Sequence, residues 1–192
     1  LANNRLAGTL PATWANLTAL QTVDLNRNSI NGTLPPNWAT MTALQRLYLY
    51  RNEINGSLPS QWDRMSALQY LRLDDNKIYG ALPSEWATMT AVRELYLDGN
   101  SIIGTLPPEW ASMKVVSRLV LHSNQLTGTV PAAWGTIGSR SSATPMLTVD
   151  VGDNVLGPTW RLPSATGFPV WPANMSVAGT FAPQRYVGPC PC

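Results

Sequence analysis

An asparagine that returns every 24 residues constrains the fold of this chain more than any other feature. The period is kept at Asn4, Asn28, Asn52, Asn76, Asn100 and Asn124, and the next equivalent, Asn154, follows after 30 residues. A fixed period of this length is typical of solenoids, whose units cannot bury their apolar faces alone and therefore stack. The sequence predicts one elongated array of units that share a continuous core. Six extra residues are expected before the last unit, near 138–145, where the sequence is loop-like.

Each unit contains a pattern that predicts one short strand. Apolar residues stand eight, five and three positions before the asparagine, as Leu44, Leu47 and Leu49 do in the third unit. The alternation predicts a strand with one buried side, and stacked units bring their strands into a parallel sheet. A glycine, an apolar–proline pair and a tryptophan follow the asparagine. Because proline restricts the backbone to an extended path, the opposite side of each unit is expected to be mostly irregular.

The asparagine and the tryptophan of each unit have structural interpretations. The asparagine amide is expected to bond backbone groups where the chain leaves the strand. The tryptophans occupy one position in each repeat, at Trp14, Trp38, Trp62, Trp86, Trp110 and Trp134. We expect a buried column in which each indole N–H finds a backbone acceptor, supported by Leu17, Met41, Met65, Met89, Met113 and Ile137. The alternative is an exposed aromatic array that stacks on sugars.

From Leu1 to about Asn154 these residues resemble the plant-type subclass of leucine-rich repeats, whose unit is Leu-x-x-Leu-x-Leu-x-x-Asn-x-Leu/Ile-x-Gly-x-Leu/Ile-Pro. The resemblance implies an α/β repeat fold: a right-handed solenoid with a parallel concave β-sheet and a mostly irregular or 3-10 convex side. Tryptophan after Leu-Pro, as in residues 104–113, is similar more narrowly to surface antigens and proteophosphoglycans of trypanosomatid parasites. That similarity implies a secreted or lipid-anchored protein that engages host molecules. Those antigens often have threonine where these repeats have asparagine, so algal and plant repeat proteins stay open as relatives.

The repeat pattern decays beyond Asn154 and suggests a division of the chain. We expect a solenoid of about seven repeats over residues 1–154 and a proline-rich capping tail over residues 155–192. Trp160 and Trp171 of the tail are expected to cover the last layer of the core.

Cysteines and glycosylation sequons are consistent with a secretory protein. Cys190 and Cys192 are too close in sequence for a relaxed mutual disulfide, so we expect their partners outside this stretch of chain, with a strained mutual bond as the alternative. Asn-x-Ser/Thr sequons, the acceptors for N-glycosylation, stand at Asn16, Asn31, Asn55 and Asn174. The expected location is secreted or cell-surface, with a lipid anchor as one means of attachment and no membrane span in this sequence.

Charge and residue content argue against several function classes. Charged residues make up 12% of the chain, and 13 basic against 11 acidic residues are too balanced for a nucleic-acid partner. His122 is the only histidine, and Ser123 beside it is expected to point to the opposite face of a strand, which excludes a nucleophile–base pair. No set of metal ligands or phosphate-binding glycine loop occurs in the sequence. We therefore expect neither an enzyme nor a cofactor.

The variable positions around each strand are the candidates for binding. They are Arg46, Tyr48, Tyr50, Tyr70, Arg72, Asp74, Glu94, Tyr96, Asp98, Arg118 and His122, all expected on the concave face. Tyrosine and arginine are enriched at binding hot spots. The alternative is a solvated sheet whose tyrosines only pack across strands.

Two carboxylates and the histidine occupy one position on successive strands. Because Asp74 and Asp98 are neighbours there, one of them is expected to keep its proton to higher pH, and His122 beside Asp98 to gain a proton more easily. The affinity of this face for its ligand could then depend on pH.

Together these features predict a recognition or adhesion module that binds a host protein ligand through its concave face. A secreted inhibitor of a cell-wall hydrolase and a receptor ectodomain are the alternatives. A further alternative is an ice-facing ladder formed by Thr9, Thr33, Ser57, Ala81, Thr105 and Thr129, which Ser57 and Ala81 interrupt.

Overall fold

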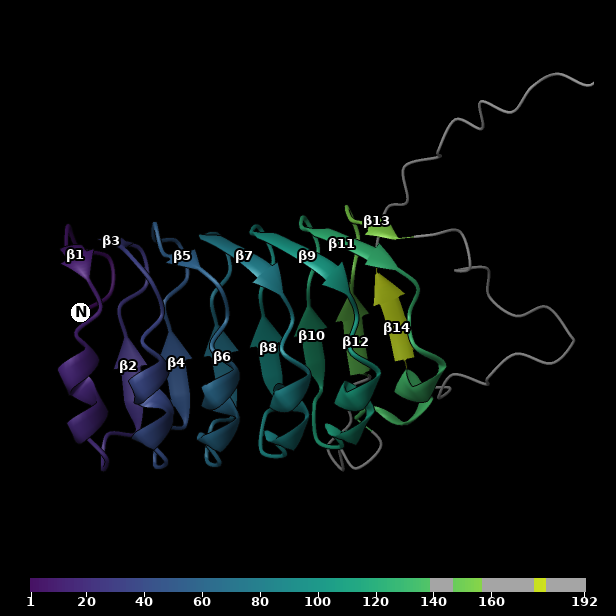
Figure 1. Cartoon of the computed structure of the whole chain (residues 1–192), viewed down its shortest axis with the longest axis horizontal. Helices are drawn as coiled ribbons and strands as arrows, with labels where there is room; N and C mark the ends of the chain where they lie inside the picture. The colour runs from purple at the N-terminus through teal and green to yellow at the C-terminus, as the bar shows by residue number, and fades with distance from the viewer. Residues whose placement is uncertain (139–146, 157–174, 179–192) are drawn as a thin grey trace, which may run out of the picture.

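Seven short parallel strands, contributed by successive repeats, form the main sheet of the molecule. The computed structural model describes residues 1–138, 147–156 and 175–178. The strands are β2 (Thr22–Asp24), β4 (Arg46–Tyr48), β6 (Tyr70–Arg72), β8 (Glu94–Tyr96), β10 (Arg118–Val120), β12 (Leu147–Asp150) and β14 (Met175–Ala178). They lie side by side in the order β14-β12-β10-β8-β6-β4-β2 (Figure 1). The parallel sheet predicted from the leucine pattern is confirmed.

A second set of parallel strands runs along the other side of each repeat. In it β1 (Ala7–Thr9) pairs with β3 (Ser29–Asn31), and a five-stranded sheet has the order β13-β11-β9-β7-β5. Its strands are β5 (Asn55–Gly56), β7 (Lys77–Ala81), β9 (Ser101–Thr105), β11 (Gln125–Gly128) and β13 (Val155–Leu156). The sequence pattern did not predict these strands.

Short 3-10 helices complete each repeat after its Leu-Pro or Val-Pro pair. They are η1 (Ala12–Asn16), η2 (Pro36–Thr40), η3 (Ser60–Arg64), η4 (Ser84–Thr88), η5 (Pro108–Ser112) and η6 (Ala132–Thr136). In η3 the preceding Pro59 keeps an extended backbone, with φ of −70°, as the fixed ring geometry of proline requires. For the residues that the structure describes, the prediction of a 3-10 side without long helices is confirmed.

The fixed glycine of each repeat is required by its conformation and by its neighbour. Gly56 has a φ of +81°, which residues with a side chain rarely adopt. A Cβ on Gly56 would lie 2.8 Å from Cγ2 of Thr33, and one on Gly32 would lie 2.8 Å from Cγ2 of Thr9. The threonine of one repeat therefore packs directly on the glycine of the next.

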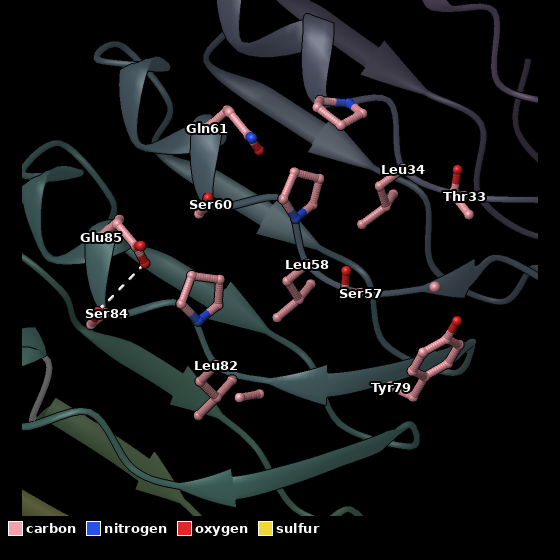
Figure 2. Close-up of a pocket in the computed structure, with 15 residues that line it drawn as sticks. Thr33, Leu34, Ser57, Leu58, Ser60, Gln61, Tyr79, Leu82, Ser84 and Glu85 are labelled. Carbon is pink, nitrogen blue, oxygen red and sulfur yellow. Dashed lines mark hydrogen bonds between the residues drawn. The ribbon is translucent and has the colours of Figure 1, made fainter.

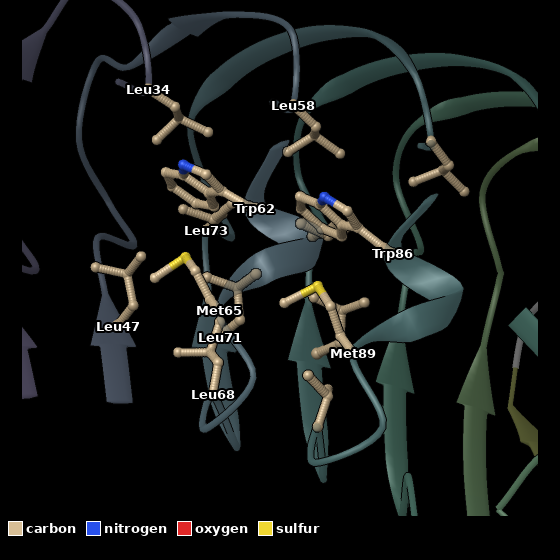
Figure 3. Close-up of a cluster of buried hydrophobic side chains, with 14 of the residues drawn as sticks. Leu34, Leu47, Leu58, Trp62, Met65, Leu68, Leu71, Leu73, Trp86 and Met89 are labelled. Atoms are coloured by element: carbon tan, nitrogen blue, oxygen red, sulfur yellow. The ribbon is translucent and has the colours of Figure 1, made fainter. Parts of the chain in front are cut away.

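Five of the six repeated tryptophans form a buried column through the core, as predicted, whereas Trp14 of the first repeat is half-buried and stacks on Trp38 with 5.9 Å between ring centroids. The side chains of Trp38, Trp62, Trp86, Trp110 and Trp134 are 0% exposed. Trp62 and Trp86 are stacked with 6.4 Å between ring centroids, and methionines and leucines surround them (Figure 3). The indole nitrogen of Trp62 donates to the carbonyl oxygen of Pro35, 3.0 Å away in the preceding repeat. The sugar-stacking alternative is wrong for these five residues.

The first repeat departs from the prediction of a buried Leu17. This side chain is 47% exposed, whereas Met41 and Met65 at the equivalent position are fully buried. In this structure the first repeat is packed on one side only, by the second repeat, so the outer side of its apolar layer faces solvent.

The repeated asparagine bonds backbone groups of its own repeat and of the repeat before it. The amide nitrogen of Asn52 donates to the carbonyl oxygens of Leu25 and Leu49, at 3.1 and 2.9 Å. Its amide oxygen accepts from the backbone N–H of Ile30 at 3.1 Å. The same arrangement recurs at Asn28, Asn76, Asn100, Asn124 and Asn154. The predicted asparagine ladder is confirmed.

Strand pairing continues beyond the last repeated asparagine. β13 pairs with β11, and β14 pairs with β12. Apart from Gly138, the predicted insertion lies outside the described residues, as do Trp160 and Trp171. The division into a solenoid and a capping tail at residue 154 stays a prediction.

Candidate ligand-binding face

The solvent side of the seven-stranded sheet carries all the residues predicted to bind a ligand, and we call it the sheet face. In the strands from β4 to β10 a buried leucine follows the first outward side chain, as Leu71 does between Tyr70 and Arg72, and Val23 takes the place of the leucine in β2. The pleat turns successive side chains to opposite sides, so these two point away from the core. The register aligns Tyr48, Arg72 and Tyr96 across neighbouring strands.

Arg72 is held between two tyrosine rings at the centre of the sheet face. Its Cζ lies 4.2 Å from the ring centroid of Tyr50 and 4.6 Å from that of Tyr96. Its Nε and Nη2 donate to the two carboxylate oxygens of Asp74 at 2.9 and 2.8 Å, and this hydrogen bonding raises the pKa of Arg72. The Asp74 side chain is only 6% exposed, so the carboxylate that holds Arg72 is itself buried.

Further contacts extend this network to both sides. Nη1 of Arg118 donates to the Tyr96 hydroxyl at 3.0 Å, and that hydroxyl donates to Glu94 at 3.2 Å. Burial raises the pKa of Tyr96, and the hydrogen bond with Tyr96 raises the pKa of Arg118. On the other side Cζ of Arg46 lies 5.5 Å from the ring centroid of Tyr70.

One predicted residue stands apart from this network. Tyr48 is half-buried on the same face, and burial raises the pKa of its hydroxyl, but it joins none of the contacts named above. The network therefore runs through Tyr50, Arg72, Tyr96 and Arg118, from just after β4 to β10, and pre-orders the face before a ligand arrives.

Asp98 is a mostly buried charge of the sheet face whose compensation is incomplete. Its Oδ2 lies 3.4 Å from Nε2 of His122, and its Oδ1 is buried without a hydrogen-bond partner among the described residues. Burial, and after it the charge of Asp74, raise the pKa of Asp98. The expected carboxylate that keeps its proton to higher pH is thus Asp98, although burial contributes more than the neighbouring acid. Easier protonation of His122 stays a prediction.

The expectation that His122 and Ser123 point to opposite faces is wrong. Nδ1 of His122 lies 3.0 Å from the hydroxyl oxygen of Ser123. The strand β10 ends at Val120, and Ser123 has a φ of +52°, so strand alternation no longer applies. The contact does not by itself indicate catalysis, because an acyl-transfer site also needs oxyanion donors and a cleft at the nucleophile.

A groove of about 700 Å³ lies elsewhere, across the Leu-Pro turns of three repeats. Leu34, Leu58 and Leu82 line it together with Tyr79, whose side chain is 57% exposed (Figure 2). Sequence reasoning did not single out Tyr79. The sequence did contain a signal, because Tyr79 occupies a repeat position at which the two preceding units have asparagine.

Replacing Asp98 by asparagine is expected to stabilise the protein by about 1 kcal/mol at pH 7. A pKa that is higher in the folded than in the unfolded state gives stability that is complete below the unfolded value and lost as pH rises through the folded value. The ionised Asp98 therefore destabilises the fold at neutral pH. Urea melts should show a gain that shrinks between pH 7 and pH 4, while Asp75→Asn, at an exposed carboxylate, serves as control. A gain that grows in acid would contradict this account.

The comparison with protein families decides what the repeats are. The family model described as Leucine Rich Repeat matches residues 19–41, 43–65 and 91–113. This fold is a leucine-rich-repeat solenoid. The asparagine ladder and the short parallel strands are the structural counterpart of the matched repeats. No curated protein sequence matches the chain.

Solved structures similar to this leucine-rich-repeat solenoid come mainly from plant receptors. The PEPR1–AtPEP1 structure has a TM-score of 0.76 and 32% identity, covering 81% of this chain and 21% of that chain. The Arabidopsis receptor kinase HAESA, in complex with the peptide hormone IDA and the co-receptor SERK1, has a TM-score of 0.73 and 25% identity, over 81% of this chain and 25% of that one. A plant ice-binding protein has a TM-score of 0.72 and 25% identity, over 84% and 53%. This chain thus spans between 21% and 53% of these proteins.

Proposed function

We propose that this solenoid is an extracellular recognition module that binds a protein or peptide ligand on the sheet face. The network of Tyr50, Arg72, Tyr96 and Arg118 carries the proposal, because it presents hot-spot residue types in a fixed arrangement. Side chains that are ordered in advance lose less entropy when a ligand binds. The complex of HAESA with a peptide hormone supports a ligand of this class.

The tyrosine packing predicted by the solvated-sheet alternative does occur, since two rings hold Arg72. The packing of the two rings on Arg72 is compatible with ligand binding as well. The Arg72 side chain remains 35% exposed although it is paired with Asp74, so a ligand can reach it. Arg46 and Arg118 are exposed at the edge of the same network.

A finer proposal places the protein on a parasite surface, with a host protein as its ligand. It rests on the Leu-Pro-x-x-Trp pattern, which is similar to trypanosomatid surface antigens. An inhibitor of a cell-wall hydrolase and a receptor ectodomain use the same face in the alternative proposals. The full-length sequence distinguishes them by a stalk with a lipid-anchor signal, a free secreted end, or a membrane span. In the part of the chain that the structure describes, no helix has the length and apolarity to cross a bilayer.

Glycosylation and disulfide bonding belong to the same proposal. Asn16, Asn31 and Asn55 are exposed and therefore accessible to modification, whereas Asn174 lies outside the described residues. Cys190 and Cys192 lie outside them too, and partners beyond this stretch of chain stay a prediction. Mass spectrometry of the secreted protein measures both modifications.

The ice-facing ladder is not favoured, in spite of the similarity to a plant ice-binding protein. The threonine column does lie on or directly after the second set of strands and is exposed. However, a Lys77–Glu53 ion pair at 3.0 Å and the exposed Tyr79 share this surface and break its regular polar pattern.

The combined change Tyr50→Ala and Tyr96→Ala is expected to weaken ligand binding by at least about 2 kcal/mol. Both rings that hold Arg72 are then lost, while the buried core is untouched, so the circular dichroism spectrum should not change. The ligand is first isolated by pull-down from host or extracellular proteins, and its affinity is then measured by calorimetry. Tyr79→Ala, at an exposed tyrosine outside the sheet face, is the control. Undiminished affinity in the double variant would place the site elsewhere.

A further inference from the structure

We propose that Asp98 selects a cationic group of the ligand, either a lysine or arginine side chain or an amino terminus. The proposal deepens the function proposed above and rests on it. In this proposal Asp98 determines which chemical group of a ligand binds to this part of the sheet face.

The other charged groups of the network each have a hydrogen-bond partner at 3.2 Å or less. Arg72 and Asp74 form a two-bond ion pair. Tyr96 connects Arg118 to Glu94 through its hydroxyl. Arg72 and Asp74 therefore neutralise each other, whereas Arg118 and Glu94 are both held at an uncharged hydroxyl.

Asp98 differs because its compensation is incomplete. Its side chain is 17% exposed, and its ionic partner is the imidazole of His122 at 3.4 Å, which is itself 36% exposed. The buried Oδ1 has no hydrogen-bond partner among the described residues. A buried polar atom without a partner needs an explanation, and a ligand that completes the site is one. A ligand cation at the exposed edge of this carboxylate would balance its charge.

The surroundings of Asp98 favour a cation over an anion. The positions two residues before the repeated asparagines hold Asn26, Tyr50, Asp74, Asp98 and His122, with two carboxylates and no lysine or arginine. An anionic ligand group would meet the repulsion of both carboxylates, since Arg72 neutralises only one of them.

If Asp98 bound no ligand, asparagine at this position would make the fold more stable. Burial penalises the ionised carboxylate at neutral pH, as the direction of its pKa shift indicates. Residues that reduce stability are typical of functional sites, where the charge is needed for binding.

The test uses peptides selected from a phage-displayed library of random 12-residue sequences on the whole wild-type chain. Selected peptides that lose binding to the Tyr50→Ala, Tyr96→Ala variant define the sheet face. We expect these peptides to share a lysine, an arginine or a required free amino terminus. Fluorescence polarisation then compares wild type, Asp98→Asn and the matched control Asp75→Asn. Binding to Asp98→Asn should fall at least about 30-fold, and Asp75→Asn should bind like wild type.

A double-mutant cycle separates a direct contact from a general effect. Replacing the basic peptide residue by norleucine should weaken binding to wild type by a similar factor and have little further effect on Asp98→Asn. Circular dichroism and urea melts confirm that Asp98→Asn is folded. Peptides that depend on Tyr50 and Tyr96 but lack a cationic group, or bind Asp98→Asn equally well, would overturn the role of Asp98 and leave the binding face intact. If no selected peptide depends on the two tyrosines, both proposals fall.

Discussion

Replacing Trp62 by alanine is expected to lower the free energy of unfolding by about 3–5 kcal/mol. The indole is fully buried and stacks on the rings of Trp38 and Trp86, each with a centroid 6.4 Å away. Alanine would leave a cavity shared by three repeats. It would also remove the indole donor of the Pro35 carbonyl oxygen, which keeps only the backbone N–H of Trp38 at 3.1 Å. The loss thus combines a packing defect with the loss of one buried hydrogen bond.

Denaturant melts followed by circular dichroism measure this loss. Tyr79→Ala is the matched control, because it removes an aromatic ring that is 57% exposed, and it should change stability by less than about 0.5 kcal/mol. Trp62→Phe keeps a stacked ring but loses the indole donor. Its loss of stability should lie between those of Trp62→Ala and Tyr79→Ala. Equal stability of Trp62→Ala and wild type would mean that the column does not support the core.

The isosteric change Asn52→Asp is expected to destabilise the protein by roughly 3–5 kcal/mol at pH 7. The amide nitrogen of Asn52 donates to two backbone carbonyls, those of Leu25 and Leu49. A carboxylate would turn an acceptor toward both, in a residue that is only 9% exposed. The new acid gains no partner for its charge, so its pKa rises on folding and the destabilisation should shrink in acid.

Asn55→Asp is the control for this prediction, because Asn55 is exposed in the same repeat. Urea melts at pH 7 and pH 4 should show a large, pH-dependent loss for Asn52→Asp and almost none for Asn55→Asp. Hydrogen exchange should locate the weakened protection at the Ile30 amide, which bonds the Asn52 side chain. A small loss at both pH values would show that the ladder contributes little.

The sequence predicts the features of this fold that depend on side chains repeated in every unit. Trp62 and Asn52 belong to columns of identical residues, so their burial and bonding follow from the period. The second set of strands does not, because it is held by backbone bonds such as Lys77 N–H to the Ile54 carbonyl, at 2.8 Å, between positions whose side chains vary. These strands also contain glycines such as Gly56. Because glycine weakens most strands, its presence gives no indication of a strand in the sequence.

The sequence predicts which residues lie on the candidate binding face, but not which of them contact one another. Strand register placed Asp74 and Asp98 together, yet Asp74 pairs with Arg72 on its own strand segment. The sequence alone does not indicate that attraction between Arg72 and Asp74 outweighs repulsion between Asp74 and Asp98. The contact between His122 and Ser123 depends on a positive φ after the strand, which periodicity cannot indicate.

The bonds that the repeated tryptophan and asparagine side chains make between repeats run in one direction along the chain. Trp62 donates to Pro35, and Asn52 bonds Leu25 and Ile30, each partner belonging to the repeat before. During synthesis on a ribosome, the partner groups of a repeat have therefore emerged before its own tryptophan and asparagine appear. Each new unit can dock as soon as its tryptophan leaves the exit tunnel, with no need to wait for later sequence. Nascent chains arrested after successive tryptophans should accordingly gain protease resistance one repeat at a time.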